Sequence, residues 1–262
     1  MTPESATAAA ADLLTSRWHA GTRLRELPEA LRPRTRAEGY AIQAQWMRRT
    51  AVPLFGWKIA ATSVAGQRHI NVDGPIAGRL LAETLLADGA TMPLGSGLMR
   101  VVEVEIAFRF GATLAPRARA YAVDEVMAAV ASLHPALELP DSRYEDFCAV
   151  GAPQLIADNA CAHRFVLGEA ASPAWRALDL AAHAVAADVV GKTRHEGRGA
   201  NALGDPRIAL TWIVNELRLL GLPMEAGQVV ITGTCVTPIP VVPGDEVRAT
   251  YGALGELSVR LA

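Results

Sequence analysis

The chain has 262 residues, 51% of them hydrophobic, and its 25 basic and 27 acidic residues give a formal net charge of −2. This length is ample for a sizeable core, and the scattered, balanced charge offers no basic stripe of the kind that nucleic-acid binding needs. No apolar stretch approaches the roughly 18–20 residues of a membrane helix, and three widely separated cysteines fit neither a disulfide framework nor a paired-cysteine zinc site. The first residues, with Glu4 and Asp12 and no basic region before an apolar block, do not resemble a signal peptide, so we expect a cytoplasmic protein without a membrane or nucleic-acid partner.

The beginning of the chain has the pattern of helices. A first helix is expected from a cap at Ser5 to Trp18, followed by a glycine that can end it. A second is expected between Thr35, which has capping-box spacing to a glutamate, and Pro53. We therefore predict a helical N-terminal part over residues 1–54.

The remainder, residues 55–262, shows short strand-like runs separated by Gly, Pro, Asn and Asp, as in a β-rich body. The expected strands are 55–60, 101–110, 135–139, 180–190, 228–232, 247–251 and 257–261, and the expected helices are 124–134 and 205–221. The sequence thus predicts a helical part that leads into a larger, strand-rich part.

The run VVEVEIAFRF at 101–110 carries two acids on one face of its expected strand. Glu103 and Glu105 are two residues apart, so their side chains emerge on the same side with α-carbons about 7 Å apart, while the apolar residues share the other face. Two carboxylates in one pocket repel each other unless a cation lies between them. The alternation alone also fits a plain amphipathic strand with its acids in water.

Glu138 offers a third carboxylate. It lies in the apolar run PALELPDSRY, and burial of a lone carboxylate is costly without a partner. All-oxygen ligands without a nearby His or Cys set favour a hard ion, Mg²⁺ or Mn²⁺, with open positions for water and substrate. We therefore treat Glu103, Glu105 and Glu138 as candidate metal ligands.

Several strings, in their order and spacing, carry a family resemblance over roughly residues 50–262. They are GWKIAATS, VEVEIAF, HPALELPDSRY, ADNA, ALGDP, and ITGT followed by PGDEV. Together they resemble the 2-keto-4-pentenoate hydratase and 4-oxalocrotonate decarboxylase group of the fumarylacetoacetate hydrolase superfamily. The resemblance implies an α+β fold, in which a mixed β-roll of the fumarylacetoacetate hydrolase C-terminal-domain type follows the helical part.

The resemblance also implies a chemistry. Glu103, Glu105 and Glu138 match the ligands of a divalent metal, and Lys58 matches a lysine beside the substrate, although a surface lysine is the simple alternative. The implied function is addition of water to a 2-hydroxy-2,4-dienoate, giving a 4-hydroxy-2-oxo acid, in meta-cleavage degradation of aromatic compounds. A 2-oxo acid can chelate the metal, which stabilises negative charge on its C2 oxygen. Lys58 could orient the substrate, relay a proton or polarise water, and desolvation would lower its pKa.

One departure from the family pattern keeps a second function open. Where many hydratases of this group have an acid, in a string such as VDEPDFG, this chain reads VDGPIAG and has Ile76, and the related decarboxylases have an apolar residue there. The C-terminal string instead resembles the hydratases. Vinylogous decarboxylation of a 2-oxo acid is therefore the first alternative, followed by hydrolysis or tautomerisation of another oxo acid, a non-catalytic partner subunit and a sensor of oxo acids.

Further candidates for substrate binding are Ile76, Asp158, Asn159 and Thr234. The Asp-Asn pair and the turn that contains Thr234 are equally typical of plain turns, and Cys161 is expected to be a small buried filler. Trp57 and the segment around Ile76 are expected to shape the substrate pocket. The expected ligand is a small 2-oxo or 2-hydroxydienoate acid. A homo-oligomer is expected, because the edges of a β-roll are commonly covered by another subunit.

Overall fold

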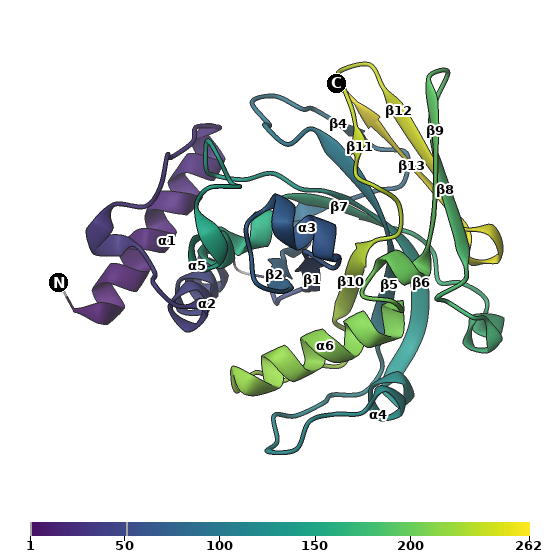
Figure 1. Cartoon of the computed structure of the whole chain (residues 1–262), viewed down its shortest axis with the longest axis horizontal. Coiled ribbons are helices and arrows are strands. Elements are labelled where there is room, and N and C mark those ends of the chain that lie inside the picture. Colours follow the sequence, from purple (N-terminus) through teal and green to yellow (C-terminus); the bar gives the residue numbers. More distant parts are fainter. Residues whose placement is uncertain (1, 51) are drawn as a thin grey trace.

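The computed structural model describes residues 2–50 and 52–262. Helices α1, α2 and α5 gather on one side of the molecule, and two curled sheets make up the rest, with α6 lying against the larger sheet (Figure 1). The helices are α1 Pro3–Ala20, α2 Arg36–Ala44, α3 Val64–His69, α4 Val123–Ala128, α5 Gly151–Ala157 and α6 Pro206–Leu219. Short 3-10 helices are η1 Glu29–Leu31, η2 Gln45–Arg49, η3 Ala82–Thr84, η4 Asn159–Cys161, η5 Pro173–Ala177, η6 Gly199–Asn201 and η7 Gly252–Leu254.

The strands form a mixed α+β architecture, as predicted. They are β1 Gly56–Ala60, β2 Ile76–Leu80, β3 Leu85–Leu86, β4 Thr91–Met92, β5 Val101–Phe110, β6 Val130–Leu139, β7 Arg164–Leu167, β8 Ala184–Val189, β9 Thr193–Arg198, β10 Val229–Thr234, β11 Ile239–Pro240, β12 Glu246–Thr250 and β13 Glu256–Leu261. The larger sheet has the order β2-β1-β10-β5-β6-β7-β3, with β11 also paired to β5, and the smaller one has the order β4-β13-β12-β8-β9.

The helical layer begins as the sequence predicts, with one shift. The cap of α1 is Thr2 and not Ser5, because Pro3 occupies the first turn, where its missing N–H is harmless. Thr35 and Glu38 form the predicted capping box of α2, which ends at Ala44 and passes into η2. The layer also contains α5, which comes from the second part of the chain and packs on α2.

An apolar cluster separate from the main core holds this layer together. Its buried members are Ala10, Ala11, Leu14, Leu27, Ile42, Trp46, Leu81, Tyr144 and Ala157. Since they come from both parts of the chain, the helical layer is anchored on the strand-rich part and not merely tethered to it.

The predicted helix over 124–134 is wrong in its second half. Residues 130–134 belong to β6, where they pair with β5, and α4 stops at Ala128. Pairing with β5 holds this segment in the strand conformation, and a periodicity count on the segment alone cannot detect that partner. The predicted strand 180–190 is likewise shorter, as β8 begins only at Ala184, and the sequence missed β2, β3, β4, β7, β9 and β11.

In the described part of the chain, no helix combines the length and the apolar character that crossing a bilayer would require.

Candidate metal centre and substrate pocket

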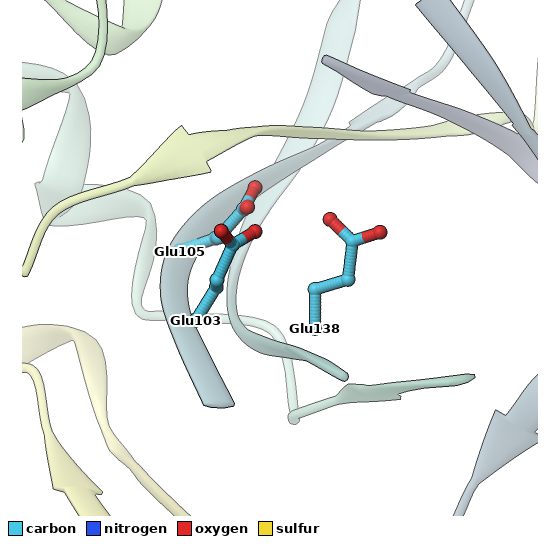
Figure 2. Close-up of side chains that lie close together, drawn as sticks. All are labelled: Glu103, Glu105 and Glu138. Atoms are coloured by element: carbon cyan, nitrogen blue, oxygen red, sulfur yellow. The ribbon is translucent and has the colours of Figure 1, made fainter. Parts of the chain in front are cut away.

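Three glutamates converge where β5 and β6 run side by side. Glu103 on β5 lies directly opposite Glu138 on β6, and Glu105 follows on the same face of β5. One carboxylate oxygen from each lies within 4.8 Å of the others. Figure 2 shows the carboxylates of Glu103 and Glu105 side by side, with that of Glu138 across from them. The antiparallel register therefore brings together the three acids that the sequence singled out.

Two buried carboxylate oxygens of this cluster lack a hydrogen-bond donor. Glu105 and Glu138 are fully buried, Oε1 of Glu105 and Oε2 of Glu138 have no partner, and Oε1 of Glu138 faces the ammonium of Lys58 at 3.0 Å. The remaining oxygen of Glu105 accepts a hydrogen bond of 2.6 Å from the backbone N–H of Gly233. Buried anionic oxygens without donors are costly, and a divalent cation bound by oxygen ligands would satisfy them. The donor set thus fits a hard cation such as Mg²⁺.

Gly233 is held in a conformation that suits no other residue. Its φ is +105°, and a β-carbon there would lie 2.2 Å from Oγ1 of Thr62. The pairing of β10 with β5 shifts register between Ile231 and Thr234, and this irregularity turns the Gly233 N–H toward Glu105. At the predicted turn, the group that contacts the acid cluster is therefore the backbone N–H of Gly233. The Thr234 hydroxyl instead donates to the carbonyl of Val236.

Lys58 comes to the same place from β1. Its side chain is 2% exposed, and Nζ lies 3.0 Å from Oε1 of Glu138 and donates a hydrogen bond of 3.2 Å to the carbonyl of Ala160. The structure therefore places Lys58 beside the acid cluster and not on the surface.

Burial and mutual repulsion shift the pKa values of these groups. Burial raises the pKa of Glu138 to about 7, although Lys58 opposes the shift. Burial, followed by the charges of Glu138 and Glu103, raises the pKa of Glu105 well above its ordinary value. Burial lowers the pKa of Lys58, but the three carboxylates outweigh it and the net pKa is raised. The expected lowering was wrong in direction, because it considered desolvation without the charges that face the lysine.

The loop that receives the lysine is strained. Asn159, Ala160 and Cys161 have φ values of 55°, 52° and 61°, a run of left-handed residues without glycine. Such conformations persist at functional sites only where their surroundings enforce them. Here the side chain of Asn159 is bonded in both directions to the backbone of Arg79, so that the amide group ties the loop to β2.

Asp158 supports this loop from behind through a buried ion pair. Its carboxylate binds Nε and the backbone N–H of Arg143 and accepts a hydrogen bond of 2.7 Å from Ser142. Arg143 also donates to the carbonyls of Asp141 and Ala162, so its guanidinium bridges both ends of the segment. Asp158 and Asn159 therefore brace the site from outside the cavity. This position fits the alternative from the sequence analysis, in which they are structural turn residues. Sequence reasoning missed Arg143, whose only signal is its place directly after the Glu138 strand.

A cavity of about 1130 Å³ opens next to Lys58 and Glu103. Ile76 and Thr234 line it, as expected, and so does Cys161, but Trp57 does not, since its Nε1 donates to Gln228 elsewhere. Burial raises the pKa of Cys161 to about 12, which keeps it a neutral thiol and supports its assignment as a filler. The sequence missed the rest of the wall, which comes from α3 and from loops near residues 98 and 147.

The model of the fumarylacetoacetate (FAA) hydrolase C-terminal family matches residues 41–262. Among characterised proteins, the chain is 34% identical over 202 residues to 2-keto-4-pentenoate hydratase of Burkholderia vietnamiensis, covering 77% of this chain and 76% of that one. It is 31% identical over 230 residues to 4-oxalocrotonate decarboxylase of Pseudomonas sp. CF600, covering 86% and 85%. A structure of 4-oxalocrotonate decarboxylase from Pseudomonas putida G7 with magnesium and adipate superposes with a TM-score of 0.89 at 28% identity, covering 100% of this chain and 99% of that one.

Proposed function

The chain belongs to the fumarylacetoacetate hydrolase C-terminal family, and from this membership we propose that it is a divalent-metal-dependent lyase that adds water to a 2-hydroxy-2,4-dienoate. The product would be a 4-hydroxy-2-oxo acid, in meta-cleavage degradation of aromatic compounds. The observation that carries the proposal is the cluster of Glu103, Glu105 and Glu138 beside Lys58, in which buried oxygens of Glu105 and Glu138 are left without a donor. Relatives that share most of the chain are named hydratases, which supports the same reaction.

Glu103, Glu105 and Glu138 would hold the metal, for which we propose Mg²⁺. When bound, the cation supplies positive charge next to the carboxylate and the C2 oxygen of a 2-oxo acid, where negative charge develops during the reaction. Glu105 and Glu138 are buried, which excludes water from one side of the cluster, while the partly exposed Glu103 faces the cavity.

Lys58 would orient the substrate. An ammonium group has three N–H donors, and here Ala160 takes one while Glu138 lies beside another, which leaves the third for a substrate oxygen. The strained loop at Ala160 fixes the direction of the ammonium group, so that the lysine is preorganised before substrate arrives. Lys58 is also the group from which a proton can pass to or from the substrate at the closed end of the cavity.

Vinylogous decarboxylation of a 2-oxo acid is the second candidate, and Ile76 is the observation that favours it. Ile76 is fully buried and lines the cavity, where its apolar side chain can neither donate nor accept a proton. The strong structural similarity to a decarboxylase points the same way. Both reactions need the same acids and lysine, so the product decides between them.

The test measures the purified protein with 2-hydroxypenta-2,4-dienoate and with 2-oxohex-3-enedioate, with Mg²⁺ and after chelation, in the wild type and in Glu105→Gln. Metal-dependent loss of the dienoate absorbance with a 4-hydroxy-2-oxo acid product is the result we expect. Release of CO₂ from the diacid, without hydration of the dienoate, would move the assignment to decarboxylase. No metal-dependent change with either substrate would refute the lyase assignment.

We further propose that the enzyme works in the cytoplasm as a homo-oligomer. Strand β9 ends the smaller sheet, and most of its residues are exposed, so it leaves an edge that a second subunit can cover. Light scattering after size exclusion measures the mass in solution, and a value of one chain would contradict this expectation.

A further inference from the structure

The wall of the cavity beyond the acid cluster is almost free of charge. Among the described residues, the side chains along the cavity that can be cationic are Lys58 and His69, and no arginine lines it. Lys58 is already engaged by Glu138 at the closed end. His69 is exposed at the end of α3 and lies against the ring of Phe147, with the ring centroids 6.1 Å apart. The cavity therefore offers no fixed, buried cation to a second carboxylate.

Polar groups of the wall are also occupied. The side-chain amide of Gln67 donates to the carbonyl of Ala61, and that of Asn201 donates to the carbonyl of Cys235. These bonds hold the two amides against the backbone, and a neutral amide brings no positive charge to balance a carboxylate. The polar side chains of the wall thus do not replace the missing cation.

Apolar side chains cover much of the remaining wall. Ile70, Ile76, Met99, Phe147 and Val236 line the cavity, and all are either buried or partly buried. When an apolar group of a ligand displaces water from such a surface, the complex is stabilised.

Two more apolar residues stand open to solvent at the same cavity. Val64 is 63% exposed and Leu98 is 48% exposed, and they come from α3 and from the loop that precedes β5. Exposed apolar side chains that gather at a pocket are typical of a surface that a ligand covers. Their position extends the apolar wall from Ile76 outward.

The cavity is also large for a five-carbon acid. Its volume of about 1130 Å³ lies just above the range of roughly 300–1,000 Å³ that is typical of pockets for drug-sized ligands. A small dienoate bound at the metal cluster and Lys58 would leave most of the apolar wall in contact with water. The space therefore suits a substrate with a larger far end.

We propose that the preferred substrate carries a neutral, apolar alkyl or aryl substituent at the end remote from its 2-oxo acid group, and that the site selects against a second carboxylate there. This inference rests on the proposed function, because it places the 2-oxo acid group at Lys58 and the glutamates. The remote substituent then lies along Ile76, Met99 and Phe147, where an ionised group would lose its hydration without gaining a partner.

The test uses unreactive 2-oxo acids as probes of the Mg²⁺-loaded enzyme, with dissociation constants from calorimetry. In the series 2-oxobutanoate, 2-oxohexanoate and 2-oxooctanoate we expect affinity to rise about fourfold per methylene, the factor that corresponds to burial of one CH₂ group. The matched pair is 2-oxohexanoate and 2-oxoadipate, which differ in a terminal methyl against a carboxylate. We expect the diacid to bind at least about tenfold more weakly, since one buried carboxylate without a partner costs more than 1.4 kcal/mol.

A variant with a cation at the cavity mouth should shift the binding preference toward the diacid. Leu98→Arg places a cation at the cavity mouth on a side chain that is already half exposed, so the fold should tolerate it. We expect this variant to bind 2-oxoadipate more tightly than the wild type does, and 2-oxohexanoate no better. Val190→Arg is the matched control, because Val190 is exposed to a similar extent, at 45%, and does not line the cavity.

The outcomes separate this inference from the proposed function. Mg²⁺-dependent binding with equal affinity for 2-oxohexanoate and 2-oxoadipate, or with no gain along the alkyl series, would overturn the inference and leave the proposed function standing. Absence of Mg²⁺-dependent binding for every 2-oxo acid would overturn both. Turnover of 2-hydroxydienoates that becomes more efficient with an alkyl or phenyl substituent, measured as kcat/KM, would support the inference on the reaction itself.

Discussion

Replacement of Glu105 by glutamine should have opposite effects on stability without and with metal. Without a cation, Glu105 is a fully buried carboxylate that faces two others, and its Oε1 has no donor. Glutamine keeps the shape and can still accept the hydrogen bond from Gly233. Its amide can also donate to the carboxylate of Glu138, whose Oε1 lies 3.0 Å from the ammonium of Lys58 and whose Oε2 has no donor. The variant should therefore be more stable than the wild type when no metal is present.

The size of the effect follows from the cost of a buried carboxylate. The rise in the pKa of Glu138 from 4.5 to about 7 corresponds to about 3 kcal/mol above neutral pH, at about 1.4 kcal/mol per pKa unit. The pKa of Glu105 is raised in the same direction by burial and by the charges of Glu138 and Glu103, so Glu105→Gln should raise Tm, by about 2–4 °C for each 1 kcal/mol of this cost that it relieves in a chain of this size. In the wild type, Mg²⁺ at about 100 times its Kd should add about 2.7 kcal/mol.

Thermal unfolding of the wild type and of Glu105→Gln, each with chelator and with Mg²⁺, gives the four unfolding temperatures to be compared. We expect the variant to unfold at the higher temperature with chelator, and the wild type alone to gain from Mg²⁺. Glu145→Gln is the control, because Glu145 is exposed and outside the cluster. Equal unfolding temperatures of wild type and Glu105→Gln in chelator, together with the same gain from Mg²⁺ in both, would refute the reasoning that Glu105 is a strained ligand.

Three further predictions concern the same site. The pKa of Glu138 is raised in the folded protein, so its stabilising contribution without metal is present at low pH and is lost as pH rises through about 7. The Tm gain from Mg²⁺ should therefore be larger near pH 8 than near pH 6. Thermal unfolding at both pH values checks this. Gly233→Ala should lose about 1–3 kcal/mol of stability and weaken Mg²⁺ binding in a titration, since its β-carbon would collide with Thr62. Asp158→Asn should cost about 3–5 kcal/mol in a denaturant titration, because it leaves Arg143 buried without its counter-ion; an unchanged midpoint would contradict a bracing role.

The metal cluster could be predicted in part because strand geometry is local. Alternation places Glu103 and Glu105 on one face of a strand whatever else the chain does. Glu138 is a different case, because its proximity depends on the register of β6 against β5. The sequence pattern gave a helix up to residue 134 and thus concealed the length of β6. The apolar run around Glu138 suggested a third ligand, and the family resemblance strengthened its connection to the other two acids.

Charge balance and bracing contacts were less accessible from the sequence. The raised pKa of Lys58 comes from acids on other strands, so a reading of its own segment yields the wrong direction. The ion pair between Arg143 and Asp158 joins residues from two loops, and neither loop has a periodic pattern. Local propensity is strongest where a helix or strand decides the geometry, and it says little about how side chains from separate segments meet.

The arrangement of charges and apolar wall bears on how one site could serve two reactions. Glu103, Glu105, Glu138 and Lys58 are all fixed by the larger sheet or by the loop braced against it, and in our proposal they would act on the 2-oxo acid end that both candidate substrates share. The far end of the substrate instead meets Ile76 and side chains from α3 and surface loops. A fully buried isoleucine cannot take a proton from water. Addition of water would therefore need a water molecule that enters from the cavity mouth, with Lys58 as the group that assists proton transfer. The uncharged wall offers no buried cation to a carboxylate at the far end, so in our proposal it favours a monoacid substrate and therefore hydration over decarboxylation.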